Sequence, residues 1–168
     1  MLSAIKRLRK ALVPAAEIAP FTELQLAAAV LLLEVSCSDF ERQPEEKTAV
    51  LQALARAFDM SNDQVSILYD NALQSADHAV SLHNFVTVIN RECSPEQKMI
   101  LLEQLWRVAF VDGRIDKYED HRIRRIAELL HMPHRAFIQS KHAAAAEGEE
   151  NRTPERLISS PASGKIKA

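Results

Sequence analysis

Two stretches of the sequence are apolar on most sides of a helix, which limits the chain to folds that enclose such helices. The first contains the longest apolar run, residues 26–33, which ends at Glu34. The second is residues 95–111, whose largest side chain is Trp106. The first run is far shorter than the roughly 20 residues that a membrane-spanning helix needs. We therefore expect both helices to lie inside a bundle, covered by other helices.

A compact turn follows the second apolar helix and sets the start of the next helix. Its sequence is Val108-Ala-Phe-Val-Asp-Gly-Arg-Ile-Asp-Lys-Tyr-Glu119. Gly113 suits the left-handed conformation that ends a helix, because it has no Cβ. Asp116 and Glu119 have the spacing of a capping box, with Asp in place of Ser or Thr. A weaker copy of this turn follows the first apolar helix at residues 35–46.

Start signals elsewhere predict further helices. Pro44 suits a first helical position, where its missing N–H is not needed. One of residues 61–63 caps another helix, and Ser94 with Gln97 forms a capping box ahead of Pro95. The chain has only three glycines, is 47% apolar and is rich in Ala, Leu, Glu, Lys and Arg, which also favours helices. These signals predict an all-α fold.

The chain repeats one pattern in residues 26–72 and 98–144. Each segment has a mostly apolar helix that ends at an Asp, a short polar loop, an amphipathic helix, a break that ends in Met, and a further helix. Neither half could bury its apolar helix alone, whereas two halves packed about a pseudo-two-fold axis would enclose both. We therefore predict an all-α bundle of seven to eight helices built from two pseudo-symmetric helical repeats. The helices that end at Asp39 and Asp112 should be the most buried.

The two ends of the chain differ from its centre. Residues 1–16 form a basic amphipathic segment: residues 2–13 place apolar side chains at helical spacing with basic ones between them, and Pro14 ends the helix. Such a helix suits an anionic membrane surface or an acidic partner, and the ordinary alternative is a terminal helix that covers part of the core. Residues 148–168 have few large apolar groups, which predicts a disordered tail. The helical domain would occupy residues 17–147.

Several of these segments together resemble the TerB-like (tellurite-resistance protein B) family over residues 22–145. They are Asp112-Gly-Arg-Ile-Asp-Lys-Tyr-Glu119, the helix end Ile126-Ala-Glu-Leu-Leu-His-Met132, and the duplicated layout. The resemblance implies an all-helical module that occurs beside other domains, in proteins tied to tellurite resistance and stress response. It also implies a metal site in the acidic turns. The first turn departs from the motif, with Phe40 in place of Gly and Gln43 in place of Asp, which would weaken a site that needs two equal halves.

The acidic residues of the two turns are candidate ligands for a hard divalent cation. If the pseudo-two-fold axis brings both turns to one end of the bundle, their carboxylates converge, and Ca²⁺ or Mg²⁺ prefers such oxygen ligands. The residues that we assign to this metal site are Asp39, Glu46, Asp112, Asp116 and Glu119, with Glu41 and Glu45 close by. The ordinary explanation is helix capping and the macrodipole, which accounts for every one of these acids except Glu41. The loop is not an EF-hand, because the alternating acids and the sixth-position glycine are missing.

Other residues give no support for catalysis or nucleic-acid binding. The net charge of −2 provides no basic footprint for nucleic acid. A Gly-rich phosphate loop and a Gly-x-Ser-x-Gly turn are absent from the sequence. Cys37 and Cys93 lie in apolar contexts, where a thiolate is disfavoured, and we interpret them as buried free thiols in a reducing compartment.

These observations lead to two functional hypotheses. The first is a non-enzymatic TerB-like module of the cytoplasm that binds a divalent cation and a protein partner, with no other cofactor. The alternative is a structural adaptor that residues 2–13 attach peripherally to the inner membrane surface. Arg122, Arg124 and Arg125 form a basic run, which is either a solvated helix face or a contact for an acidic partner.

Overall fold

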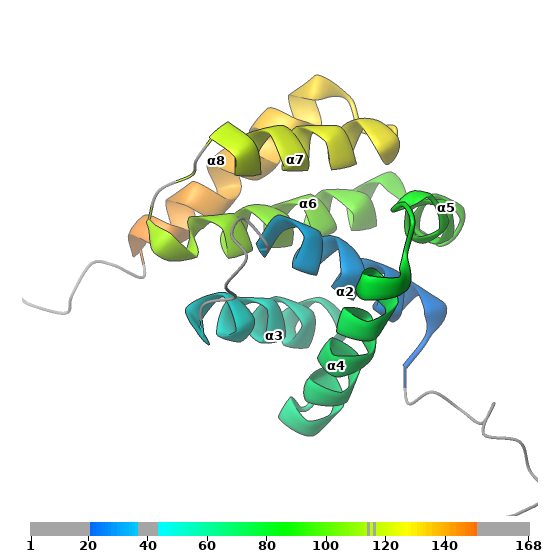
Figure 1. Ribbon diagram of the computed structural model, residues 1–168. Coiled ribbons are helices and arrows are strands. Elements are labelled where there is room, and N and C mark those ends of the chain that lie inside the picture. Colours follow the sequence, from blue (N-terminus) through cyan, green and yellow to red (C-terminus); the bar gives the residue numbers. More distant parts are fainter. Residues whose placement is uncertain (1–20, 37–43, 114, 116, 151–168) are drawn as a thin grey trace, which may run out of the picture.

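The computed structural model describes residues 21–36, 44–113, 115 and 117–150, and these contain helices and connections but no strand (Figure 1). The elements are α2 (Glu23–Ser36), α3 (Pro44–Phe58), α4 (Asn62–His78), α5 (His83–Glu92), α6 (Pro95–Ala109), the 3₁₀ helix η1 (Phe110–Asp112), α7 (Lys117–Leu129) and α8 (His134–Glu150). This confirms the predicted all-α bundle. The expected N-terminal helix within residues 1–16, and the membrane attachment through it, lie outside the described residues and stay predictions.

The helix ends follow the sequence signals closely. Ser61 and Ser94 each cap a helix with a complete capping box, as the Ser94 N–H donates to the Gln97 side chain at 2.8 Å and the Gln97 N–H donates to the Ser94 hydroxyl at 3.3 Å. Toward the C-terminus, α8 continues to Glu150 and so includes the first three residues of the expected tail, 148–150. None of the helices in the described residues combines the length and the apolar character that a membrane crossing requires.

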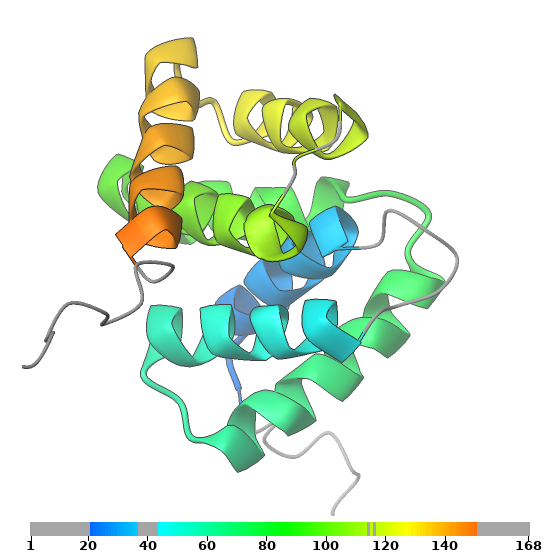
Figure 2. The same ribbon diagram turned by 90° about the vertical axis from the view of Figure 1, so that its left-hand side faces the viewer.

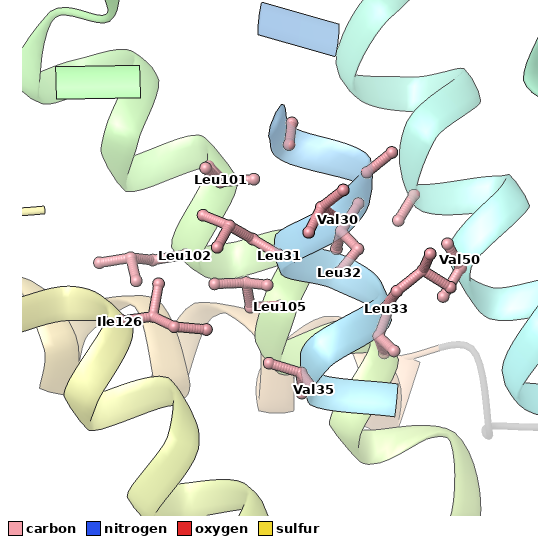
Figure 3. Close-up of a cluster of buried hydrophobic side chains, with 14 of the residues drawn as sticks. Val30, Leu31, Leu32, Leu33, Val35, Val50, Leu101, Leu102, Leu105 and Ile126 are labelled. Carbon is pink, nitrogen blue, oxygen red and sulfur yellow. The ribbon is translucent and has the colours of Figure 1, made fainter. Parts of the chain in front are cut away.

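The core lies around α2 and α6, which cross at the centre of the molecule (Figure 2). Nine residues of α2 and seven of α6 are buried, more than in any other helix of the described residues. Figure 3 shows Leu31 of α2 facing Leu102 of α6, while Leu33 points the other way, toward Val50 of α3. Five helices pack on α2, namely α3, α4, α5, α6 and α7. This enclosure explains why α2 tolerates apolar residues on nearly every side.

The packing follows the order of the repeated pattern. Each central helix contacts the two helices that follow it, α2 with α3 and α4, and α6 with α7 and α8. Each also contacts the second helix of the other half, because α6 packs on α3 and α2 packs on α7. These contacts agree with a duplication, and the pseudo-symmetry of the two halves stays a prediction.

A buried polar contact joins α6 to α8. The indole Nε1 of Trp106 donates to the hydroxyl oxygen of Ser140 at 3.1 Å, and that hydroxyl donates to the carbonyl oxygen of Phe137 at 2.8 Å. Both the Trp106 and the Ser140 side chains are fully buried. Beside them, Lys141 of α8 bonds Asp120 of α7 at 2.6 Å. The last two helices are therefore fixed to the core by specific polar partners as well as by apolar packing.

Candidate functional site

The elements that flank the two acidic turns meet on one side of the bundle. The end of α2, the start of α3, η1 and the start of α7 lie at the left of Figure 1 and face the viewer in Figure 2. The guanidinium of Arg122, in the second turn of α7, donates to the carbonyl oxygen of Glu34 near the end of α2 at 3.2 Å. In addition, η1 packs on α3. In each half, the end of the central helix and the start of the helix that follows it thus lie on the same side of the bundle.

The structure places the side chains of only two predicted ligands. Glu46 is half-buried in the first turn of α3, and Glu119 is 9% exposed in the first turn of α7. The backbone of Asp112 ends η1. Asp39 and Asp116 lie outside the described residues, as does Glu41, so the metal site as a whole stays a prediction. Among the side chains that are described, no three His, Cys, Asp or Glu residues are grouped as a metal site would require.

The turn after η1 has the backbone that its sequence predicts. Gly113 has φ 75° and ψ 2°, the left-handed conformation, and its N–H donates to the carbonyl oxygen of Phe110 at 2.8 Å. Glycine adopts this conformation without the steric penalty that a Cβ brings. Ile115 is half-buried against the core. The described part of this turn therefore consists of one left-handed glycine and one apolar residue packed against the core.

Acidic side chains gather in the first turns of the helices on this side. Glu45 and Glu46 occupy the first turn of α3, and Glu119 and Asp120 that of α7, where the helix macrodipole favours anions. Burial by itself raises the pKa of Asp120. The hydrogen bonds and positive charges of Lys141 and Arg124 have a larger, opposite effect, so the pKa lies below its ordinary value. Asp120 is thus held by α8 as a structural ion pair and is not one of the predicted ligands.

A second candidate surface is a groove between the α4–α5 connection and α7, which we call the basic groove. Its volume is about 520 Å³. It is lined by Glu34, Val80, Ser81, Leu82, His83, His121, Arg122, Arg125, Ile126 and Leu129. The arginine run in the sequence pointed to α7, but sequence analysis missed the contribution of the α4–α5 connection. The available signal was the pair of apolar residues, Val80 and Leu82, in a break between helices, where polar residues are usual; Val80 is fully exposed.

Comparison with known proteins supports the family resemblance of this sequence. The chain matches the model of the family described as "Tellurite resistance protein TerB" over residues 25–142. A search of the curated proteins finds no match. Among solved structures, a protein of unknown function from Porphyromonas gingivalis W83 has the same fold, with a TM-score of 0.55 and 20% sequence identity. That match covers 75% of this chain and 97% of the other.

The family match includes the turn that contains Gly113, all of α6 and α2 from its third residue onward, and it extends over well more than half of the chain. The described fold, with its enclosed α2 and α6 and a left-handed glycine after η1, agrees with the motif that carried the resemblance. This chain belongs to the tellurite resistance protein TerB family.

Proposed function

We propose that this protein is a non-catalytic TerB module of the cytoplasm that binds a divalent cation, Ca²⁺ or Mg²⁺, with carboxylates from its two acidic turns. The main support is that the elements flanking both turns meet on one side of the bundle (Figure 2). Carboxylates held close to one another repel, and a divalent ion relieves that repulsion. The bound ion would stabilise the contact between the two halves, in the stress-response setting that the family suggests.

Glu46 and Glu119 support this proposal by their equivalent places in the two halves. Each is the third residue of its helix, α3 or α7. Each also follows its turn's first acid, Asp39 or Asp112, by seven residues. Both side chains are partly or largely withdrawn from water. Carboxylates at equivalent positions on a shared side of the bundle would supply hard oxygen ligands from both halves.

We infer that the halves are copies of one unit, which is the arrangement that such a site needs. The second helix of each half ends in the same way, with a left-handed residue before a methionine: Asp59 has φ 50° and His131 has φ 57°. In both breaks the methionine N–H reaches back five residues, from Met60 to the carbonyl oxygen of Ala55 at 3.3 Å, and from Met132 to that of Ala127 at 2.9 Å. This is the longer bond of a Schellman motif. The same helix C-terminal geometry at corresponding places in the two halves supports a duplication.

The cation proposal is tested by thermal unfolding in CaCl₂ or MgCl₂ after the metal has been removed. A cation that binds only the folded state stabilises it by about 2.7 kcal/mol at a hundred times its Kd, so the melting temperature should rise with concentration. Asp112→Asn should remove most of that rise. The matched control is Asp63→Asn, which removes an exposed acid from the first turn of α4 and should leave the rise intact.

The capping explanation gives the opposite outcome. If the acids only cap helices, the melting temperature is indifferent to divalent ions, and Asp116→Ala lowers stability by about 1 kcal/mol with or without metal. Either an absent cation effect, or an Asp63→Asn variant that loses it as fully as Asp112→Asn, would contradict the proposal.

We further propose that the protein partner docks an acidic amphipathic segment in the basic groove. Two arginines, two histidines and one carboxylate line this groove together with the apolar Leu82, Ile126 and Leu129. A probe for this chemistry is a fluorescent helical peptide of Leu and Glu, measured by anisotropy at several salt concentrations. Binding should weaken with salt and be lost in Arg125→Glu, but not in Arg135→Glu on the exposed face of α8. Equal binding by both variants would rule the groove out.

A further inference from the structure

A third surface feature is a groove where the start of α6 meets the connection from α7 to α8, which we call the apolar groove. Its volume is about 550 Å³. Its apolar lining residues are Met99, Ile100, Met132, Pro133 and Ala136. Ile100 is 49% exposed, and apolar surface that is gathered in one place usually marks a contact site. The apolar groove shares no residue with the basic groove or with the predicted metal ligands, so its chemistry is independent of both.

Acidic side chains border the apolar groove along α6. Glu96 lines it, and Glu103 follows Ile100 by three residues, which places it beside Ile100 on the helix surface. Within the described residues, neither carboxylate forms an ion pair. Lys98 also lines the groove, but its ammonium donates to the carbonyl oxygen of Leu130 at 3.1 Å. The occupant that fits is therefore an apolar segment that also has positive charges.

The size of the groove favours a short segment over a second copy of the chain. Ten residues line it, whereas a stable interface between proteins uses about 20–30 residues on each side. A single amphipathic helix, by contrast, docks through a few apolar side chains at helical spacing. Residues 2–13 of this chain have that pattern, with basic side chains between the apolar Leu2, Ile5, Leu8 and Leu12.

The described chain begins close to the groove. Glu23, the first residue of α2, forms an ion pair with Arg91 in the last turn of α5 at 3.3 Å. Pro95, which lines the groove, follows Arg91 by four residues and so lies at most roughly 14 Å from it. Figure 1 shows the start of α2, α5 and the start of α6 on one side of the molecule. Residues 14–20 can span roughly 23 Å when extended, which is sufficient to bring residues 2–13 to the groove.

We propose that residues 2–13 dock as a helix in the apolar groove of the same chain. Their apolar side chains contact Met99 and Ile100, and their basic side chains pair with Glu96 and Glu103. Docking removes both apolar surfaces from water and brings opposite charges together at the edge of the groove. The docked segment cannot lie on a membrane surface at the same time, because both contacts use the same apolar side chains.

The test is limited digestion of the full chain with trypsin, followed by mass spectrometry of the cuts within residues 6–10. Docking slows these cuts, since a protease attacks only the fraction of molecules in which the segment is released. Ile100→Glu places a charge in the groove and should accelerate the cuts at least about tenfold. The matched control is Ile67→Glu on α4, because Ile67 is 45% exposed and lies outside the groove; this variant should be cut as slowly as the unmodified chain.

Two further variants test the segment and the charges. Leu12→Ser lies outside the described fold and should accelerate the cuts even if Ile100→Glu does not fold. Glu103→Lys should accelerate them severalfold, whereas Asp70→Lys, at an exposed acid of α4, should not.

Three results would overturn the proposal. The first is an unmodified chain that is cut as fast as Ile100→Glu and Leu12→Ser, which leaves residues 2–13 free for a membrane surface. The second is an Ile67→Glu variant that loses protection as fully as Ile100→Glu. The third is protection that disappears when the protein is diluted, which places the segment on a second copy of the chain.

Discussion

The contact between Trp106 and Ser140 gives a direct test of what attaches α8 to the core. Ser140→Ala removes the oxygen that accepts from the indole Nε1 at 3.1 Å. Both side chains are fully buried, so water cannot replace the lost acceptor. A buried donor without a partner costs about 1–3 kcal/mol. For a chain of this size each kcal/mol lowers the melting temperature by roughly 2–4 °C, so a loss near 2 kcal/mol predicts a fall of about 4–8 °C.

A double-mutant cycle separates the hydrogen bond from other effects of the substitution. In a Trp106→Phe background no indole N–H exists, so adding Ser140→Ala should lower the free energy of unfolding by about 0.5 kcal/mol or less. The coupling energy should therefore be at least about 1 kcal/mol. Circular dichroism is the right readout, because Trp106 is the single tryptophan and its fluorescence is lost in that background.

The matched control is Ser66→Ala, the same substitution on the exposed surface of α4. Alanine is the better helix former, so this change should leave stability equal or raise it by up to about 0.5 kcal/mol. Two results would refute the reasoning: a Ser140→Ala variant within 0.5 kcal/mol of the unmodified chain, or a cycle whose single effects simply add.

Four further outcomes follow from backbone conformation and charge. Gly113→Ala should lose about 1–2 kcal/mol in urea unfolding, because φ 75° is strained for a residue with a Cβ. Asp59→Gly and His131→Gly should each gain roughly 0.5–1 kcal/mol for the same reason, and a loss in either would contradict it. The pKa of Asp120 is lowered in the folded state, so its ion pair stabilises fully above the ordinary value of 3.8, and this stabilisation is lost as the pH falls through the lowered folded-state pKa. Asp120→Asn should therefore cost about 0.5–1 kcal/mol at pH 7, and the cost should shrink steadily as the pH falls below 3.8. Burial raises the pKa of the Cys93 thiol, so in a Cys37→Ser background alkylation at pH 7.5 should be slower than that of free cysteine.

The helices and their ends were predictable from sequence, since they depend on residues close together in the chain. Ser94 and Gln97 predicted a capping box, and the structure has it. Gly113 predicted a residue in the left-handed conformation at the end of a helix, and its φ is 75°. The apolar run at residues 26–33 predicted an enclosed helix, and α2 is in contact with five others. Each of these features follows from local hydrogen bonding, steric limits or the exclusion of apolar surface from water, so the order of residues is sufficient.

Only the tertiary structure decided which distant residues share a site. The sequence placed Gln104 and Arg107 on one helix face, but it gave no sign that α3 and α8 would leave a cavity beside them. It likewise marked the arginines of α7 without showing that the α4–α5 connection completes a groove. The reason is physical: the angle at which helices cross depends on how all of their side chains interlock, and no single segment contains that information. A sequence determines which surfaces must be buried, and the packing of the whole chain determines what is left open between them.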